Sequence, residues 1–116
     1  MLRDYKNIDE YQKLALRTAP KNLTRGDEIL NGLMGLNGEA GEAIDIYKKT
    51  LYMGHPFDKE HMIKELGDVC WYLALICHGM DIPMSEGLEK NIAKLEARYP
   101  EGFDIDKSLN RAKGDV

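Results

Sequence analysis

The sequence predicts an all-α protein whose helices pack as a four-helix bundle. Apolar residues recur at helical spacing along most of the chain, and Pro or Gly separates the helix-forming stretches. The apolar run at residues 69–77 is too short to span a membrane and is typical of a buried helix. With 116 residues, the chain is expected to form a single domain, residues 1–116.

Start and stop signals place each helix. The predicted helices cover residues 8–19, 27–53, 59–78 and 85–99, and residues 101–116 are predicted to form a polar tail. Asn7 or Asp9 starts the first helix, and Pro20 stops it. Asp58 is expected to cap the third helix and Gly79 to end it, while Pro100 ends the fourth.

The second predicted helix contains glycines at every third position. Gly lowers the stability of a helix interior, so its repeated occurrence here indicates a structural role. We interpret it as close approach of a neighbouring helix and of a ligand to the backbone. The four residues are Gly32, Gly35, Gly38 and Gly41.

Two acidic motifs predict a site. Glu39 and Glu42 form an ExxE motif in the second helix, and Glu65 and Asp68 form an ExxD motif in the third. Residues three apart share a helix face, and here the acids interrupt apolar stripes. Four converging carboxylates repel one another unless a cation joins them, and oxygen ligands alone favour Mg²⁺ or Mn²⁺. The alternative for either motif alone is a set of surface acids that pair with lysines.

Several cationic and polar side chains are candidates for phosphate binding. Asn91, Lys94 and Arg98 form one stripe of the fourth helix and could bind phosphate oxygens. The alternative is that this stripe is an ordinary solvent-exposed helix face. Lys49 points nearly the same way as Glu42, although an Asp45–Lys49 pair at i, i+4 explains it equally well.

The aromatic, histidine and cysteine residues are less informative. Tyr72 lies one turn beyond Asp68 and is either a platform for a nucleobase or a core residue. The three histidines form no ligand set, so none is assigned a role; they are His55, His61 and His78. Cys70 and Cys77 lie on one helix and suit a reducing, cytoplasmic location.

Composition narrows the possible partners. A formal net charge of −4 and a pI near 5.4 argue against a nucleic-acid binder, and no polybasic patch or apolar segment suggests a membrane partner. Residues 69–77 make their helix apolar on almost every face, so one chain of this length offers too few partners to bury it. This favours coverage of the helix by a second subunit. We expect a homotetramer rather than a dimer; coverage by the tail is the alternative.

The two motifs and the end of the fourth helix resemble the MazG-like nucleotide pyrophosphohydrolases. The resemblance includes Gly35-Leu-Asn-Gly-Glu-Ala-Gly-Glu-Ala43, Glu65-Leu-Gly-Asp-Val-Cys-Trp-Tyr-Leu-Ala74 and Asn91-Ile-Ala-Lys-Leu-Glu-Ala-Arg-Tyr-Pro100. It covers about residues 30–103 and suggests a compact, single-domain member. Asn31 stands where many relatives carry His, and the base-recognition residues of the first helix have no clear counterpart.

This resemblance implies hydrolysis of nucleoside triphosphates between the α- and β-phosphates, giving monophosphate and pyrophosphate. It also implies Mg²⁺ held by Glu39, Glu42, Glu65 and Asp68, and an oligomeric enzyme. One of these carboxylates, for which we favour Glu39, is expected to orient or deprotonate the attacking water. Two other functions remain as alternatives. One is a carboxylate-bridged di-iron bundle, although such bundles use Glu-x-x-His pairs that this sequence lacks. The other is a helical partner-binding module without turnover.

Overall fold

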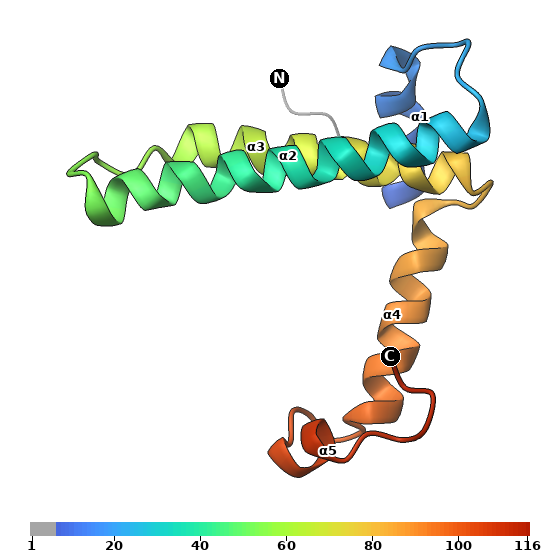
Figure 1. The fold of residues 1–116 in the computed structure, drawn as a ribbon. Helices are drawn as coiled ribbons and strands as arrows, with labels where there is room; N and C mark the ends of the chain where they lie inside the picture. The colour runs from blue at the N-terminus through green and yellow to red at the C-terminus, as the bar shows by residue number, and fades with distance from the viewer. Residues whose placement is uncertain (1–6) are drawn as a thin grey trace. The chain divides into compact units, whose positions relative to one another are not determined.

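A computed structural model describes residues 7–116, and its helices confirm the all-α prediction (Figure 1). No β-strand occurs in this described range. The elements are α1 (Ile8–Ala15), the 3₁₀ turn η1 (Leu16–Thr18), α2 (Arg25–Tyr52), α3 (Lys59–Gly79), α4 (Met84–Arg98) and α5 (Ile105–Leu109). None of the described helices is long and apolar enough to cross a membrane.

Side-chain caps explain where the helices begin. Asn7 accepts a hydrogen bond from the Glu10 amide, and Asp58 accepts one from His61, as the sequence predicted. Thr24 caps α2, so that helix begins two residues before the predicted start. Asp104 caps α5, a short helix that the sequence analysis treated as tail. The first helix ends earlier than expected because its last turn is a 3₁₀ turn.

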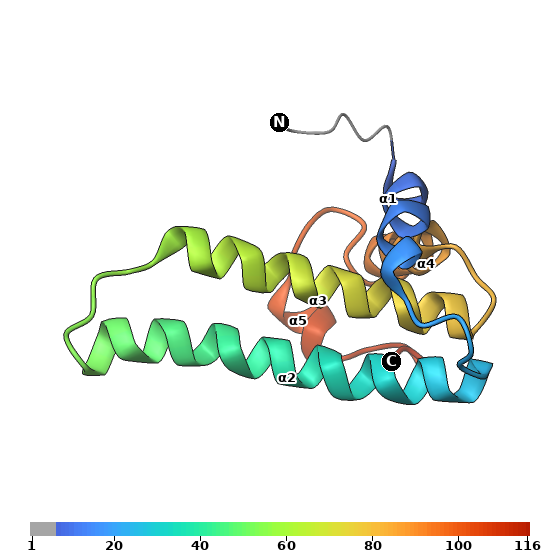
Figure 2. The same cartoon turned by 90° about the horizontal axis from the view of Figure 1, so that it is seen from above.

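Two glycines bring α2 and α3 together as an antiparallel hairpin, seen side by side in both views (Figures 1 and 2). A Cβ at Gly32 would meet the Ile76 side chain and would lie 3.2 Å from the Tyr72 carbonyl oxygen. A Cβ at Gly35 would overlap the Tyr72 ring. Close helix approach is therefore confirmed at these two positions.

The other two glycines do not support the same interpretation. Within the described residues, no neighbouring atom lies within 4 Å of a Cβ built at Gly38 or Gly41. Both positions are exposed, so packing against α3 does not explain these two glycines.

Buried polar groups attach α1 to α3. The Gln12 side chain is 8% exposed; its amide nitrogen donates to the Ala74 carbonyl at 3.2 Å, and its oxygen accepts from the Met84 amide at 3.1 Å. Trp71 donates from Nε1 to the Ala15 carbonyl at 3.0 Å and to the Thr18 hydroxyl at 2.9 Å. The Gln12 bonds satisfy buried donors and acceptors, and together with the Trp71 bonds they fix α1 and η1 on one side of α3.

The chain divides into two compact units, which are described separately. The first unit ends at Met84 and contains α1, α2 and α3, while the second spans Ser85–Val116. In the second unit the C-terminal segment folds back on α4, where Arg98 pairs with Asp115. The sequence-based expectation that residues 1–116 form a single domain remains a prediction.

We expect Gly32→Ala and Gly38→Ala to change stability in opposite directions. The Gly32 variant should lose about 1–3 kcal/mol, because a methyl group there overpacks the α3 backbone. The Gly38 variant should gain up to about 1 kcal/mol, since Ala favours an exposed helix position. Urea denaturation of the two variants measures both effects, and equal changes would contradict the packing explanation.

Candidate functional site

The hairpin brings three of the four predicted acids together. Glu39 and Glu42 on α2 and Glu65 on α3 each offer a carboxylate oxygen, and these atoms all lie within 4.8 Å of one another. Glu65 is buried with 7% exposure, Glu39 is half-buried and Glu42 is exposed. The cluster therefore runs from the interior of the hairpin to its surface.

The helix register produces this arrangement. Glu39 follows Gly35 by four residues and continues the face of α2 that contacts α3. Glu65 precedes Tyr72 by seven residues, so it lies on the face of α3 that packs against that glycine. Close helix approach thus sets the carboxylates opposite each other.

The electrostatics of the cluster match a crowded set of acids. The pKa of Glu39 is raised to about 7, first by its hydrogen bond with Glu65, then by burial and by the negative charges of Glu42, Glu65 and Asp68. The pKa of Glu65 is lowered, chiefly by the same hydrogen bond from Glu39. Below about pH 7 the shared proton therefore resides on Glu39, while Glu65 carries the charge.

Two oxygens of the cluster lack partners. Glu39 Oε2 and Glu65 Oε2 are buried, and neither has a hydrogen-bond partner among the described residues. An unpaired buried carboxylate oxygen is costly, and a divalent cation would satisfy both atoms and offset the repulsion. Because the three-residue cluster consists of carboxylates alone, its chemistry fits Mg²⁺ or Mn²⁺.

Asp68 lies outside this group of three. It is exposed on α3, yet its charge contributes to the raised pKa of Glu39. The fourth predicted acid is thus close enough to act electrostatically on the cluster without sharing its close contacts.

Sequence analysis missed the role of His61. Its Nε2 lies 3.1 Å from Glu65 Oε1, and this contact helps to lower the pKa of Glu65. The i, i+4 spacing of the two residues on α3 was the signal that could have found it. His61 also lines a pocket of about 360 Å³ together with Glu42, Lys49 and His55.

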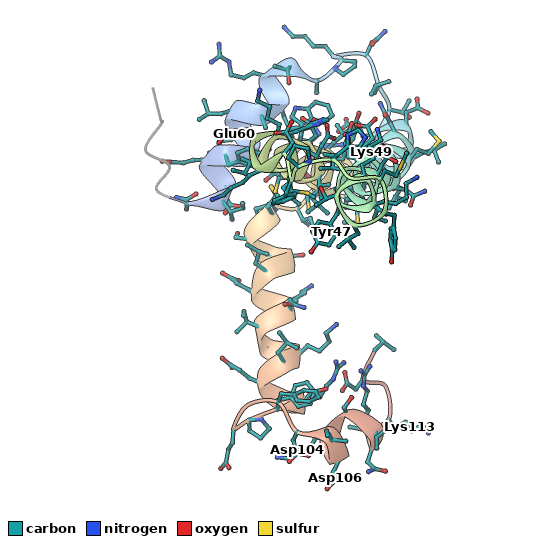
Figure 3. The ribbon with its side chains drawn as sticks, turned by 90° about the vertical axis from the view of Figure 1, so that its left-hand side faces the viewer. Tyr47, Lys49, Glu60, Asp104, Asp106 and Lys113 are labelled. Atoms are coloured by element: carbon teal, nitrogen blue, oxygen red, sulfur yellow. The ribbon has the colours of Figure 1, made fainter. Side chains whose placement is uncertain are left out.

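Lys49 is engaged by an acid of its own helix. Its Nζ lies 3.0 Å from Asp45, whose other carboxylate oxygen is 3.3 Å from Lys48. This is the i, i+4 pair that the sequence offered as an alternative. Lys49 and Tyr47 leave α2 in different directions (Figure 3), and Lys49 lines the pocket beside Glu42.

Tyr72 packs within the hairpin. Its ring lies against Gly35 and makes an edge contact with Trp71, with ring centroids 5.1 Å apart. These contacts match the core alternative for Tyr72, and nucleobase stacking by this residue stays a prediction.

The remaining phosphate candidates belong to the second unit. Asn91, Lys94 and Arg98 all lie on α4. Arg98 is already paired, because Nε and Nη2 donate to the two oxygens of Asp115 at 2.8 and 2.6 Å. Asn91 and Lys94 are exposed.

Comparison with known proteins gives two matches. The sequence model described as "MazG nucleotide pyrophosphohydrolase domain" matches residues 28–103, which include all four predicted acids. The "Gene 37 protein" of Mycobacterium phage L5 is 34% identical over 118 residues, covering 90% of this chain and 99% of the phage protein. No solved structure gave a significant match.

The raised pKa of Glu39 predicts how stability depends on pH. Folded Glu39 has a pKa of about 7 against an ordinary value of 4.5, so the folded state binds more protons between about pH 4.5 and about pH 7. The free energy of unfolding of the metal-free protein should therefore fall as pH rises through this window.

Urea denaturation in EDTA at a series of pH values measures this dependence. Glu39→Gln cannot titrate, so the variant should lose this part of the pH dependence and gain on the wild type as pH rises. The Glu65 shift acts at lower pH, because its pKa is below the ordinary value. Parallel profiles for wild type and variant would contradict the assignment.

Proposed function

Because the chain belongs to the MazG nucleotide pyrophosphohydrolase family, we propose that it is a metal-dependent hydrolase of nucleoside triphosphates. The proposed reaction cleaves between the α- and β-phosphates and releases nucleoside monophosphate and pyrophosphate. The cluster of Glu39, Glu42 and Glu65 within the matched region supports this proposal most strongly. Such an activity fits housekeeping of the cytoplasmic nucleotide pool.

Each acid has a proposed role. Glu39, Glu42, Glu65 and Asp68 would hold Mg²⁺, or Mn²⁺ in its place. The bound ion would neutralise phosphate charge and make the attacking water more acidic. Glu39, in its deprotonated form, would orient this water and accept its proton.

Other side chains have proposed roles in positioning the acids and in binding the substrate. His61 would keep Glu65 in place through the contact at 3.1 Å. Lys49, Asn91, Lys94 and Arg98 remain the candidates for binding phosphate, and Tyr72 the candidate for stacking on the base. Nucleobase preference follows from none of these residues.

A nucleotide panel tests the reaction. With Mg²⁺, the chain should convert nucleoside triphosphates to monophosphate and pyrophosphate, measured by chromatography and a pyrophosphate assay, and EDTA should stop turnover. Release of diphosphate and inorganic phosphate would mean that a different bond is cleaved.

Substitutions link this activity to the acids. Glu42→Gln and Asp68→Asn should each lower kcat/KM by about 100-fold or more, because a ligand charge is lost, while helical circular dichroism stays unchanged. Glu60→Gln, an exposed acid on α3 outside the cluster, is the matched control. Wild-type turnover in either variant would remove that residue from the proposed site.

We also propose that the protein is a homo-oligomer, with a tetramer favoured over a dimer. In the first unit, α3 has α2 and α1 as neighbours, yet Leu66 and Leu73 are 53% and 38% exposed. On α2, Ile44 and Leu51 are 69% and 57% exposed. Apolar surface of this extent suits an interface between copies.

Light scattering coupled to size exclusion tests the oligomer. The expected mass at micromolar concentration is a multiple of 13.2 kDa, with four copies favoured. Leu66→Glu, which places a charge in the apolar surface, should shift the population towards smaller species. A stable monomer of the unmodified chain would overturn this proposal.

A further inference from the structure

His61 places a nitrogen donor at the edge of the acidic cluster. Its Nε2 lies 3.1 Å from Glu65 Oε1, and its backbone amide donates to the Asp58 carboxylate at 3.0 Å, which fixes its position in the first turn of α3. The His61 side chain is 53% exposed, whereas that of Glu65 is 9% exposed. An accessible imidazole therefore faces a buried carboxylate of the cluster.

The separation of these two atoms suits two ligands of one metal ion. Ligands at right angles around an ion, each about 2.1 Å from it, lie about 3.0 Å apart. His61 Nε2 and Glu65 Oε1 lie at nearly this distance. An ion bound by both atoms would replace the hydrogen bond between them, and the imidazole would keep its proton on Nδ1.

Glu65 links His61 to the other acids. Its second oxygen, Oε2, is buried and has no hydrogen-bond partner among the described residues. Glu65 also belongs to the group of three carboxylates formed with Glu39 and Glu42. An ion on Glu65 therefore has carboxylate ligands to one side and an imidazole nitrogen to the other.

The pocket beside the cluster gives such an ion room. Glu42 and His61 both line this space of about 360 Å³, and Lys49, which also lines it, is already paired with Asp45. Because His61 lies outside the group of three acids, the ion that it shares with Glu65 would lie on the pocket side of the cluster. Water from the pocket would fill the remaining coordination positions.

We propose that His61 is a metal ligand, and that together with Glu65 it makes the site bind a divalent transition-metal ion in preference to Mg²⁺. Imidazole nitrogen suits transition metals, whereas Mg²⁺ favours oxygen ligands and keeps several waters. The inference rests on the cation site of the proposed function and changes the metal selectivity expected of it. It gives His61 a role beyond holding Glu65 in place.

One substitution separates ligation from positioning. Calorimetric titration of the full chain, without nucleotide and at one fixed pH, gives the dissociation constants for Co²⁺ and Mg²⁺. The glutamine amide in His61→Gln can still donate a hydrogen bond to Glu65 but offers no imidazole nitrogen. Co²⁺ binding should therefore weaken about 10-fold or more, while Mg²⁺ binding changes by less than about twofold. Unchanged Co²⁺ binding, or equal weakening for the two ions, would overturn the proposal.

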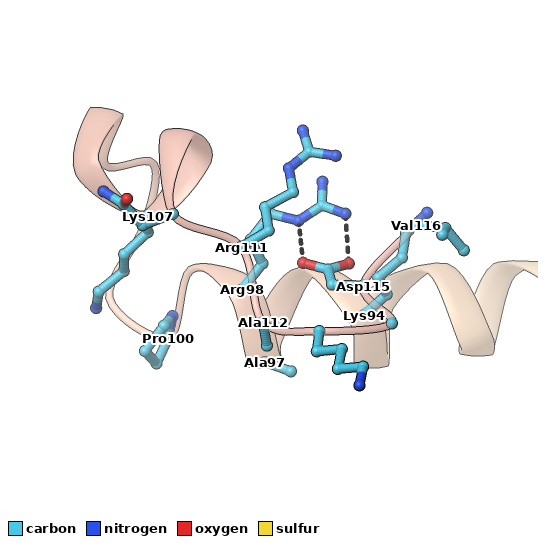
Figure 4. A pocket seen from close by; sticks show the side chains of 12 residues that line it. Lys94, Ala97, Arg98, Pro100, Lys107, Arg111, Ala112, Asp115 and Val116 are labelled. Carbon is cyan, nitrogen blue, oxygen red and sulfur yellow. Dashed lines mark hydrogen bonds and ion pairs between the residues drawn. The ribbon is translucent and has the colours of Figure 1, made fainter.

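His55→Gln is the matched control. His55 lines the same pocket, but His61 is the histidine that contacts Glu65. The control should bind both ions as the wild type does, and a loss of Co²⁺ affinity equal to that of His61→Gln would count against His61 as the ligand. A competing ion is not expected in the pocket of the second unit, because its carboxylate, Asp115, is already paired with Arg98 (Figure 4).

Pulsed electron paramagnetic resonance identifies the ligand directly and does not depend on turnover. With Mn²⁺ as the probe, nitrogen modulation from an imidazole should appear in the wild type and in His55→Gln and be absent from His61→Gln. Identical spectra from the wild type and His61→Gln would overturn ligation by His61. Helical circular dichroism shows whether each variant is folded.

These measurements also separate this inference from the proposed function. Nitrogen ligation by His61 in a chain that turns over no nucleoside triphosphate would leave the inference standing and reject catalysis. Turnover by a chain whose Co²⁺ affinity does not depend on His61 would do the reverse.

Discussion

The close approach of α2 and α3 controls the first unit. Gly32 and Gly35 leave no Cβ between the helices, so Ile76 and Tyr72 reach the α2 backbone. One turn further along, the same face of α2 carries Glu39, which then meets Glu65 across the hairpin. A larger residue at either glycine would separate the helices, and the carboxylates would move apart with them. Packing and site geometry therefore depend on the same two positions.

The same close approach of α2 and α3 that positions the acidic cluster also brings repelling carboxylates together, which lowers the stability of the metal-free fold. The hairpin positions several acids close together, and the hydrogen bond with Glu65, burial and the neighbouring negative charges raise the pKa of Glu39 to about 7. Polar contacts elsewhere in the unit, such as the Trp71 bonds to α1 and the buried Glu28 carboxylate 2.5 Å from His78, help to hold the helices in place. Local conflict with good packing rules is expected where a protein performs its function.

The sequence predicted the helices well because their signals are local. Caps at Asn7 and Asp58 and the helix-breaking residues are read from a few neighbouring positions. The meeting of Glu39 with Glu65 was also predictable, since a register of three and four residues fixes the shared faces. The Asp115 contact with Arg98 was not, because it depends on how a weakly periodic tail folds back. For the same reason, no sequence pattern distinguished Gly35, which packs, from Gly38, which is exposed.

Gln12 has a consequence for the order in which the chain acquires its structure. Its side chain bonds to backbone groups 62 and 72 residues away, whereas α2 and α3 are joined by a short connection. Contacts of small sequence separation form with less loss of chain entropy, so the hairpin has an advantage in forming first. During synthesis on a ribosome, the Gln12 side-chain amide cannot form all of these hydrogen bonds until Met84 has emerged. Although α1 is synthesised before α2 and α3, it is thus expected to be among the last elements of the first unit to dock.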